Sequence, residues 1–118
     1  MPTNHLETSV RREPGGAILD LHGEINGFGQ EALNAAYAEA EKGDPEAIIL
    51  NFEGVDYINS TGIALIVGLL RKARASKRHF RAYGLSEHYL EIFEITRLSD
   101  FVGLYPDEES ALSEASVS

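Results

Sequence analysis

Cysteine is absent from this chain of 118 residues. Its absence excludes a disulfide framework, a thiolate metal site and a cysteine nucleophile, and it is compatible with a reducing compartment. We therefore expect a cytoplasmic protein. Basic residues are also few, because ten lysines and arginines stand against 19 acidic residues, for a net charge of −9. This balance disfavours binding to nucleic acid or to an anionic membrane, so a protein partner is expected.

Long hydrophobic runs are missing as well. The longest spans residues 63–70, which is too short to cross a bilayer, and residues 1–5 do not begin a secretory signal. With 43% hydrophobic residues, the chain fits one globular domain over residues 1–118. A domain of this size buries roughly two thirds of its unfolded surface. Fraying is expected at residues 1–5 and 116–118.

No pattern typical of an enzyme is present. The histidines are scattered without the spacing of metal ligands, and they are His5, His22, His79 and His88. The glycines at the end of the second predicted strand do not complete a dinucleotide loop, and neither a Walker motif nor a Gly-x-Ser-x-Gly motif occurs. We expect no catalytic residue, no metal and no cofactor.

The first part of the chain predicts a hairpin followed by a helix. Residues 6–12 and 17–22 alternate weakly on either side of a Pro-Gly-Gly turn, and residues 23–27 are expected to break the second strand. A helix follows, with an apolar stripe spaced three and four residues apart, and Gly43 is its candidate C-cap. The residues of that stripe are Leu33, Ala36, Tyr37 and Ala40.

The rest of the chain alternates strands with helices. Residues 47–52 are almost continuously apolar, which is typical of a central strand covered by helices on both faces. Short strands are expected at residues 79–83 and 101–105. Helices are expected after Ser86 and after Asp107, both of which are candidate N-caps. The order β-β-α-β-α-β-α-β-α predicts an α/β domain with a mixed, mostly parallel sheet, an N-terminal hairpin and about four helices.

The chain is organised around residues 57–62, where an apolar strand ends, a polar cluster follows and an apolar helix begins. Ser60 is expected at the start of this helix as its N-cap, where free backbone N–H groups and the helix dipole favour an anion such as a phosphate. The alternative is that Ser60 only caps the helix.

The helix after Ser60 has one face that is predicted to be buried. Its apolar stripe consists of Ile63, Ile66, Val67, Leu70 and Ala73. Leu65, Gly68 and Lys72 fall away from that stripe, so they are candidates for a partner-binding surface. For Leu65, packing at the edge of the core is an equal alternative. We expect Gly62 to be needed because a partner approaches the backbone closely there.

The sequence resembles the STAS domain family, and within it the anti-sigma factor antagonists of bacteria. Residues 23–26, 48–52 and 58–62 carry the resemblance in the right order, over nearly the whole chain. The segment Asn59-Ser60-Thr61-Gly62 is similar to the family's Asp-Ser-Ser/Thr-Gly signature. The resemblance implies that Ser60 is phosphorylated by a partner that is both a protein kinase and an anti-sigma factor. A serine phosphatase would reverse that reaction.

Two residues depart from the family pattern, because Asn59 and Asn26 stand where aspartates are usual. Asparagine retains hydrogen bonding and turn geometry, so the fold is expected to be the same. The missing charge removes a group that could orient the kinase, yet it also lowers the repulsion toward a phosphoserine.

The resemblance implies a binding switch. The unphosphorylated domain would occupy the anti-sigma factor and so release a sigma factor, and phosphorylation of Ser60 would end the contact. A second reading is a STAS subunit fixed in an ABC-type lipid-transport complex, which needs no phosphate. The two asparagines favour that alternative, whereas Ser60-Thr61-Gly62 favours the switch. A small enzyme is the least favoured reading, because no acid, base and nucleophile converge.

Overall fold

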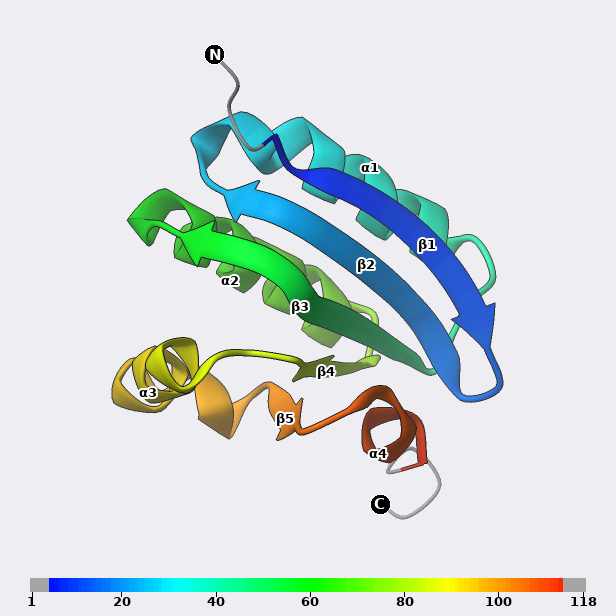
Figure 1. Ribbon diagram of the computed structural model, residues 1–118. Helices are drawn as coiled ribbons and strands as arrows, with labels where there is room; N and C mark the ends of the chain where they lie inside the picture. The colour runs from blue at the N-terminus through cyan, green and yellow to red at the C-terminus, as the bar shows by residue number, and fades with distance from the viewer. Residues whose placement is uncertain (1–4, 114–118) are drawn as a thin grey trace.

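The computed structural model describes residues 5–113, so most of the expected fraying at residues 1–5 and 116–118 lies outside it. A five-stranded sheet has the strand order β1-β2-β3-β4-β5 (Figure 1). The strands are β1 (Glu7–Glu13), β2 (Gly16–Ile25), β3 (Ala47–Ile58), β4 (His79–Tyr83) and β5 (Gly103–Tyr105). The α-helices are α1 (Gln30–Glu41), α2 (Ser60–Ala75), α3 (Glu87–Ile95) and α4 (Glu108–Ser113), and short 3-10 helices are η1 (Gly27–Gly29) and η2 (Leu98–Asp100). The predicted class and element order are confirmed.

The N-terminal hairpin forms as predicted, but its second strand is longer. β1 and β2 are antiparallel from Glu7 opposite His22 to Glu13 opposite Gly16, while β2, β3, β4 and β5 are parallel. The expected break at residues 23–27 is wrong, because β2 continues to Ile25. Gly23 has a φ of 103° and the register shifts between it and Glu24, so a bulge lets the strand bend and still pair with β3.

β3 is the central strand, as predicted, and it extends past the apolar run to Ile58. Its pairing with β4 ends at Asn51, which leaves the last part of β3 open on that side. There the backbone N–H of Ile58 donates to the hydroxyl of Tyr89, from α3, at 2.8 Å. This bond satisfies a buried donor that the sheet does not reach.

The two faces of the sheet are covered unequally. α1 and α2 lie behind the sheet in Figure 1. The main core lies on their face, and Tyr89 and Phe93 of α3 join it. On the other face, a small second core packs under α4 and contains Ile18, Ala47, Ile49, Tyr83 and Ala111. Helices therefore cover both faces of β3 only near its start.

Three helix ends were predicted from short sequence signals. Ser86 caps α3 and Asp107 accepts a hydrogen bond from the backbone N–H of Ser110 in α4, as expected. Gly43 is not the residue that ends α1. Lys42 is the C-cap, and the left-handed conformation falls on Asp44, with a φ of 53°. Aspartate tolerates this conformation better than most residues, so the backbone conformation of this turn does not require glycine.

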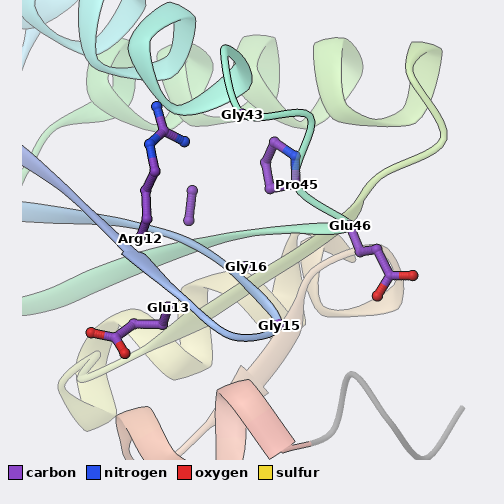
Figure 2. Close-up of a pocket in the computed structure, with 8 residues that line it drawn as sticks. Arg12, Glu13, Gly15, Gly16, Gly43, Pro45 and Glu46 are labelled. Atoms are coloured by element: carbon purple, nitrogen blue, oxygen red, sulfur yellow. The ribbon is translucent and has the colours of Figure 1, made fainter.

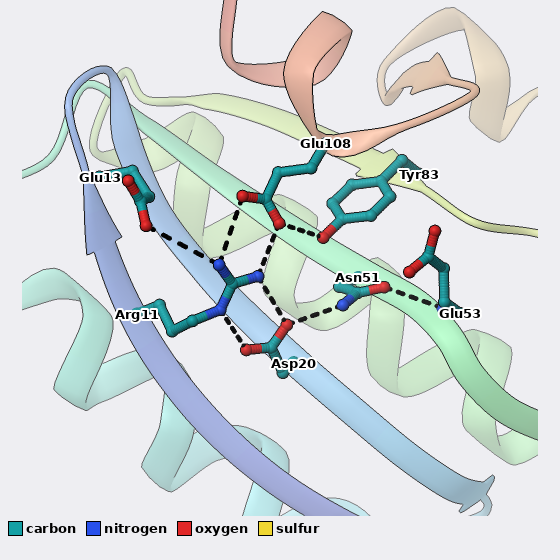
Figure 3. A network of polar contacts seen from close by, with 7 residues as sticks. All are labelled: Arg11, Glu13, Asp20, Asn51, Glu53, Tyr83 and Glu108. Atoms are coloured by element: carbon teal, nitrogen blue, oxygen red, sulfur yellow. Dashed lines mark hydrogen bonds and ion pairs between the residues drawn. The ribbon is translucent and has the colours of Figure 1, made fainter.

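A polar network on the second face holds α4 against the hairpin (Figure 3). The Arg11 guanidinium donates to Asp20 at 2.6 Å and to Glu108 of α4 at 2.7 Å. Asn51 donates to Asp20, and the Tyr83 hydroxyl donates to Glu108 at 2.8 Å. The hydrogen bonds from Arg11 lower the pKa of Asp20 and of Glu108 below their ordinary values. β1, β2, β3, β4 and α4 are thereby joined.

We expect Arg11→Gln to weaken the pH dependence of stability. A carboxyl group whose pKa is lowered by folding stabilises the fold above its ordinary pKa of about 4, and this stabilisation is lost as the pH falls below that value. The variant should therefore be less stable than wild type at pH 7 and should lose less stability between about pH 5 and pH 2. Urea unfolding across this range measures both effects. Arg97→Gln, which removes an exposed pair with Asp100, is the control, and an identical pH profile in both variants would contradict the assignment.

Two tyrosines provide a matched test of buried hydroxyl groups. Tyr89→Phe leaves the N–H of Ile58 buried without a partner, so it should lower the free energy of unfolding by about 1–2 kcal/mol. The hydroxyl of Tyr37 is buried without a well-formed hydrogen bond among the described residues, and burial, followed by the nearby Glu41 carboxylate, raises its pKa to about 12. Tyr37→Phe should therefore leave stability unchanged or increase it. Urea denaturation of both variants checks this, and equal losses would contradict the prediction.

Candidate functional site

The start of α2 is capped by Asn59, and the expectation that Ser60 is the N-cap is wrong. The backbone of Asn59 is extended, and its side-chain oxygen accepts a hydrogen bond from the N–H of Gly62 at 2.8 Å. Its backbone carbonyl accepts the first helical bond, from Ile63. Ser60 is the first helical residue and is exposed. Because Asn59 does the capping, the Ser60 hydroxyl takes no part in it.

Two backbone donors remain at this helix end. Within residues 5–113, no hydrogen bond occupies the N–H of Ser60 or of Thr61. Free N–H groups and the positive end of the helix dipole both stabilise negative charge. The first turn of α2 contains no acidic residue whose negative charge would already offset the positive end of the helix dipole. The site therefore favours an anion beside Ser60.

Gly62 is required by the protein's own packing. It is buried, and a Cβ placed on it would collide with the carbonyl oxygen of Ile25, at the end of β2. The same carbonyl accepts the N–H of Asn59 at 3.2 Å. The first turn of α2 thus lies directly against β2. A larger side chain is excluded by this contact, so packing inside the protein already requires the glycine. The expected close approach of a partner at Gly62 stays a prediction.

Asn26 caps the neighbouring turn. Its side-chain oxygen accepts the N–H of Phe28 at 2.9 Å, and its carbonyl accepts the N–H of Gly29, which fixes η1. A Cβ on Gly27 would lie 3.5 Å from the side-chain methyl of Thr61, so this turn is next to the start of α2. The structure therefore brings Asn26, Asn59, Ser60 and Thr61 together at one end of the sheet.

The three outer positions predicted on α2 have different environments. Leu65 is partly buried and packs against the core, in agreement with the alternative given for it. Gly68 borders open space, because no atom of the described residues lies within 4 Å of the position that a Cβ would take there. The Lys72 amine donates to Asn34 of α1 at 3.2 Å and lies over the ring of Tyr37. Lys72 is thus the exposed one of the three positions, while Gly68 is half-buried and has unfilled space beside it.

Several residues at or near the site were not predicted from the sequence. In α2, Leu69 is fully buried although it was not part of the predicted apolar stripe. Ile63 and Val67 were part of that stripe, but they are only partly buried. Near the site, Phe28 is 98% exposed and Tyr57 is 51% exposed. Phe28 lies between two glycines, just after the predicted turn residue Asn26. An aromatic residue in such a turn is the sequence signal that could have identified Phe28 as exposed. Exposed aromatic rings beside a site are common in protein interfaces.

A hollow of about 200 Å³ lies at the other end of the molecule, between the hairpin turn and the segment after α1 (Figure 2). Arg12 reaches across it and donates to the carbonyls of Glu39 and Ala40 at the end of α1. A Cβ on Gly43 would collide with this guanidinium. The hollow is thus part of a helix C-cap, in which an arginine satisfies the last carbonyls.

Residues 5–113 offer neither a metal site nor a membrane span. No group of three or more histidine or acidic side chains in this range is placed to hold a metal ion. No helix in the described part of the chain is both long and apolar enough to cross a membrane. The start of α2 and the η1 turn therefore remain the candidate site.

Comparisons with known proteins point to one family. The STAS domain model matches residues 7–111. An anti-sigma-B factor antagonist of Staphylococcus aureus is 29% identical over 84 residues, which cover 71% of this chain and 78% of that protein. An anti-sigma factor antagonist from Mycobacterium paratuberculosis has a similar structure, with a TM-score of 0.80 at 21% identity and 93% coverage of both chains.

A second solved relative is the anti-sigma factor antagonist SpoIIAA. Its unphosphorylated form has a TM-score of 0.70 at 19% identity, covering 92% of this chain and 96% of that one. The phosphorylated form of the Bacillus protein has a TM-score of 0.67 at 22% identity, covering 92% and 98%. These structures share the fold described above. The family model spans nearly the whole described chain, and the chain belongs to the STAS domain family.

Proposed function

We propose that this protein is an anti-sigma factor antagonist whose binding is switched by phosphorylation of Ser60. The observation that carries the proposal is the state of Ser60, which is exposed, free of capping and placed in the signature segment at the start of α2. The names of the relatives found above support the same class of function, and the solved SpoIIAA relative exists in a phosphorylated form. The protein acts as a binding partner in the cytoplasm rather than as an enzyme.

The partner is an anti-sigma factor that is also a serine kinase. In the unphosphorylated state, the partner covers the start of α2, the η1 turn and the outer side of α2 near Gly68. Phe28 offers an exposed ring there, on a turn whose backbone is held by the hydrogen bonds that Asn26 accepts. A rigid aromatic side chain loses little entropy when it is buried in an interface. Binding occupies the anti-sigma factor and releases its sigma factor, and a serine phosphatase restores this state.

Ser60 is a better acceptor than Thr61 for a reason that the fold supplies. Both residues are exposed in the first turn of α2, so exposure does not separate them. The methyl group of Thr61, however, lies toward Gly27 of the adjacent turn, and its branched Cβ restricts its rotamers. Serine carries no such methyl group, so the Ser60 hydroxyl can turn outward without disturbing η1.

Phosphorylation changes the energy of the interface in a simple way. It adds a charge of about −2 to a surface that the partner would desolvate. The free N–H groups of Ser60 and Thr61 stabilise this charge while it is solvated. Burying an uncompensated charge costs about 3–5 kcal/mol. Such a cost lowers affinity more than about a hundredfold, which is enough to release the partner.

The first experiment on this proposal tests Ser60 itself. Incubation with the cognate kinase and ATP should add one phosphoryl group, which peptide mass mapping should place on Ser60. Ser60→Ala should abolish the reaction and retain affinity for the partner. Ser60→Asp should weaken affinity, though less than phosphoserine, because it carries less charge and fewer acceptor oxygens. A phosphate on Thr61, or none at all, would overturn the proposal and favour a fixed docking role, such as that of a subunit in an ABC-type lipid-transport complex.

The second experiment tests the missing carboxylate at Asn59. Asn59→Asp retains an acceptor for the N–H of Gly62, so α2 stays capped while a negative charge is added beside Ser60. We expect the rate of phosphorylation to rise with stability unchanged. Asn59→Ala is the control, since loss of the cap should cost about 1 kcal/mol of unfolding free energy. An unchanged or slower rate in Asn59→Asp would show that this kinase needs no carboxylate at that position.

A further inference from the structure

The lysines and arginines of this chain are concentrated in one stretch. Residues 60–86, which run from the start of α2 to the cap of α3, contain six of the ten and no acidic residue. All 19 acidic residues and only four basic ones lie in the rest of the chain. A chain with a net charge of −9 therefore contains one segment of strongly positive charge.

Among the described residues, four of these six cations are exposed and have no carboxylate partner. Every other lysine and arginine within residues 5–113 forms an ion pair, apart from the buried Arg81. Cations near the C-terminal end of a helix offset its dipole, but that end carries only about half a negative charge. Most of their charge thus stays available to a partner. The four residues lie in the last turns of α2 and the turn that follows, and they are Arg71, Lys72, Arg74 and Lys77.

Two of these cations are held by neutral groups, which fix a side chain without cancelling its charge. The Lys72 amine donates to the side-chain oxygen of Asn34 at 3.2 Å and lies 5.8 Å from the ring centre of Tyr37. The guanidinium of Arg74 lies 4.8 Å from the ring centre of Phe101. Both contacts leave a full positive charge at the surface. A side chain that is already held loses less entropy when a partner binds it.

Arg71 lies on the same side of α2 as Ser60. It follows Ser60 by 11 positions, so it is about 20° from Ser60 around the helix axis and about 16 Å along it. Ala64 and Gly68 come between them on this side of the helix. Ala64 is exposed, and Gly68 has unfilled space beside it. These short side chains let the surface of a partner follow the helix from Ser60 to Arg71.

We propose that the partner carries an acidic surface that docks on the basic end of α2, formed by Arg71, Lys72 and Arg74; this proposal rests on the function proposed for Ser60. A local acidic patch matches these three cations, whereas a nucleic acid or an anionic membrane would also meet the acidic remainder of the chain. Complementary charges act mainly on the rate of association. The basic end of α2 thus steers the partner to the helix that carries Ser60.

The rate of association with the cognate kinase tests this surface. ADP replaces ATP, so that no phosphate is transferred, and stopped-flow mixing follows binding at about 50 to 300 mM salt. Arg71→Glu alters an exposed side chain without a partner among the described residues, so the variant should fold normally. We expect it to associate about tenfold more slowly, or slower still, at the lowest salt, and to depend less on salt than wild type.

Lys42→Glu is the matched control, because it changes the net charge equally at an exposed position after α1. It should associate within about twofold of the wild-type rate. Equal rates in the two variants, with wild type still phosphorylated on Ser60 when ATP is supplied, would overturn this proposal alone. A wild-type chain that does not bind the kinase would overturn the function proposed for Ser60 as well. Saturable binding to duplex DNA or to phosphatidylserine vesicles at the same salt, lost in Arg71→Glu, would overturn the acidic protein surface in favour of that polyanion.

Discussion

The contact between Gly62 and the carbonyl of Ile25 is the constraint on which the candidate site of this protein depends. A side chain at Gly62 would collide with that carbonyl, which also accepts the N–H of Asn59. Because glycine has no Cβ, the first turn of α2 lies directly on the end of β2. This arrangement places the η1 turn beside Ser60, although the two segments are far apart in the sequence. The site is therefore a product of close packing.

The two asparagines of the site have structural roles that explain why amides can stand in place of carboxylates. Asn59 caps α2 and Asn26 caps η1, and each does so by accepting a backbone hydrogen bond. Capping needs an acceptor oxygen, which an amide and a carboxylate both provide. The fold consequently sets no requirement for charge at either position. Any advantage of a carboxylate would arise in the encounter with a partner enzyme.

The charged and polar groups discussed above lie at the two ends of the sheet and on the face that packs against α4. On that face, Arg11 joins the hairpin to α4 through Asp20 and Glu108, so the C-terminal helix depends on a side chain from the first strand. The Ser60 end offers free N–H groups, whereas the opposite end contains Arg74 and the buried Arg81. A single net charge for the whole chain conceals this separation, because electrostatic interactions act over short, local distances.

Local periodicity and short capping signals in the amino-acid sequence are enough to set the types of element and their order. The Pro-Gly turn of the hairpin, the central apolar strand and the caps at Ser86 and Asp107 were all predictable in this way. Packing between elements sets how far β2 and β3 extend, since a strand continues wherever a neighbour pairs with it, even past a glycine.

Three features of the structure likewise arise only when the chain is folded. Asn59 rather than Ser60 caps α2, Tyr89 completes the hydrogen bonding of Ile58, and Arg81 of β4 is buried against the Ala111 carbonyl of α4. Each of these outcomes depends on which atoms approach one another across the fold, and local sequence patterns carry no information about that.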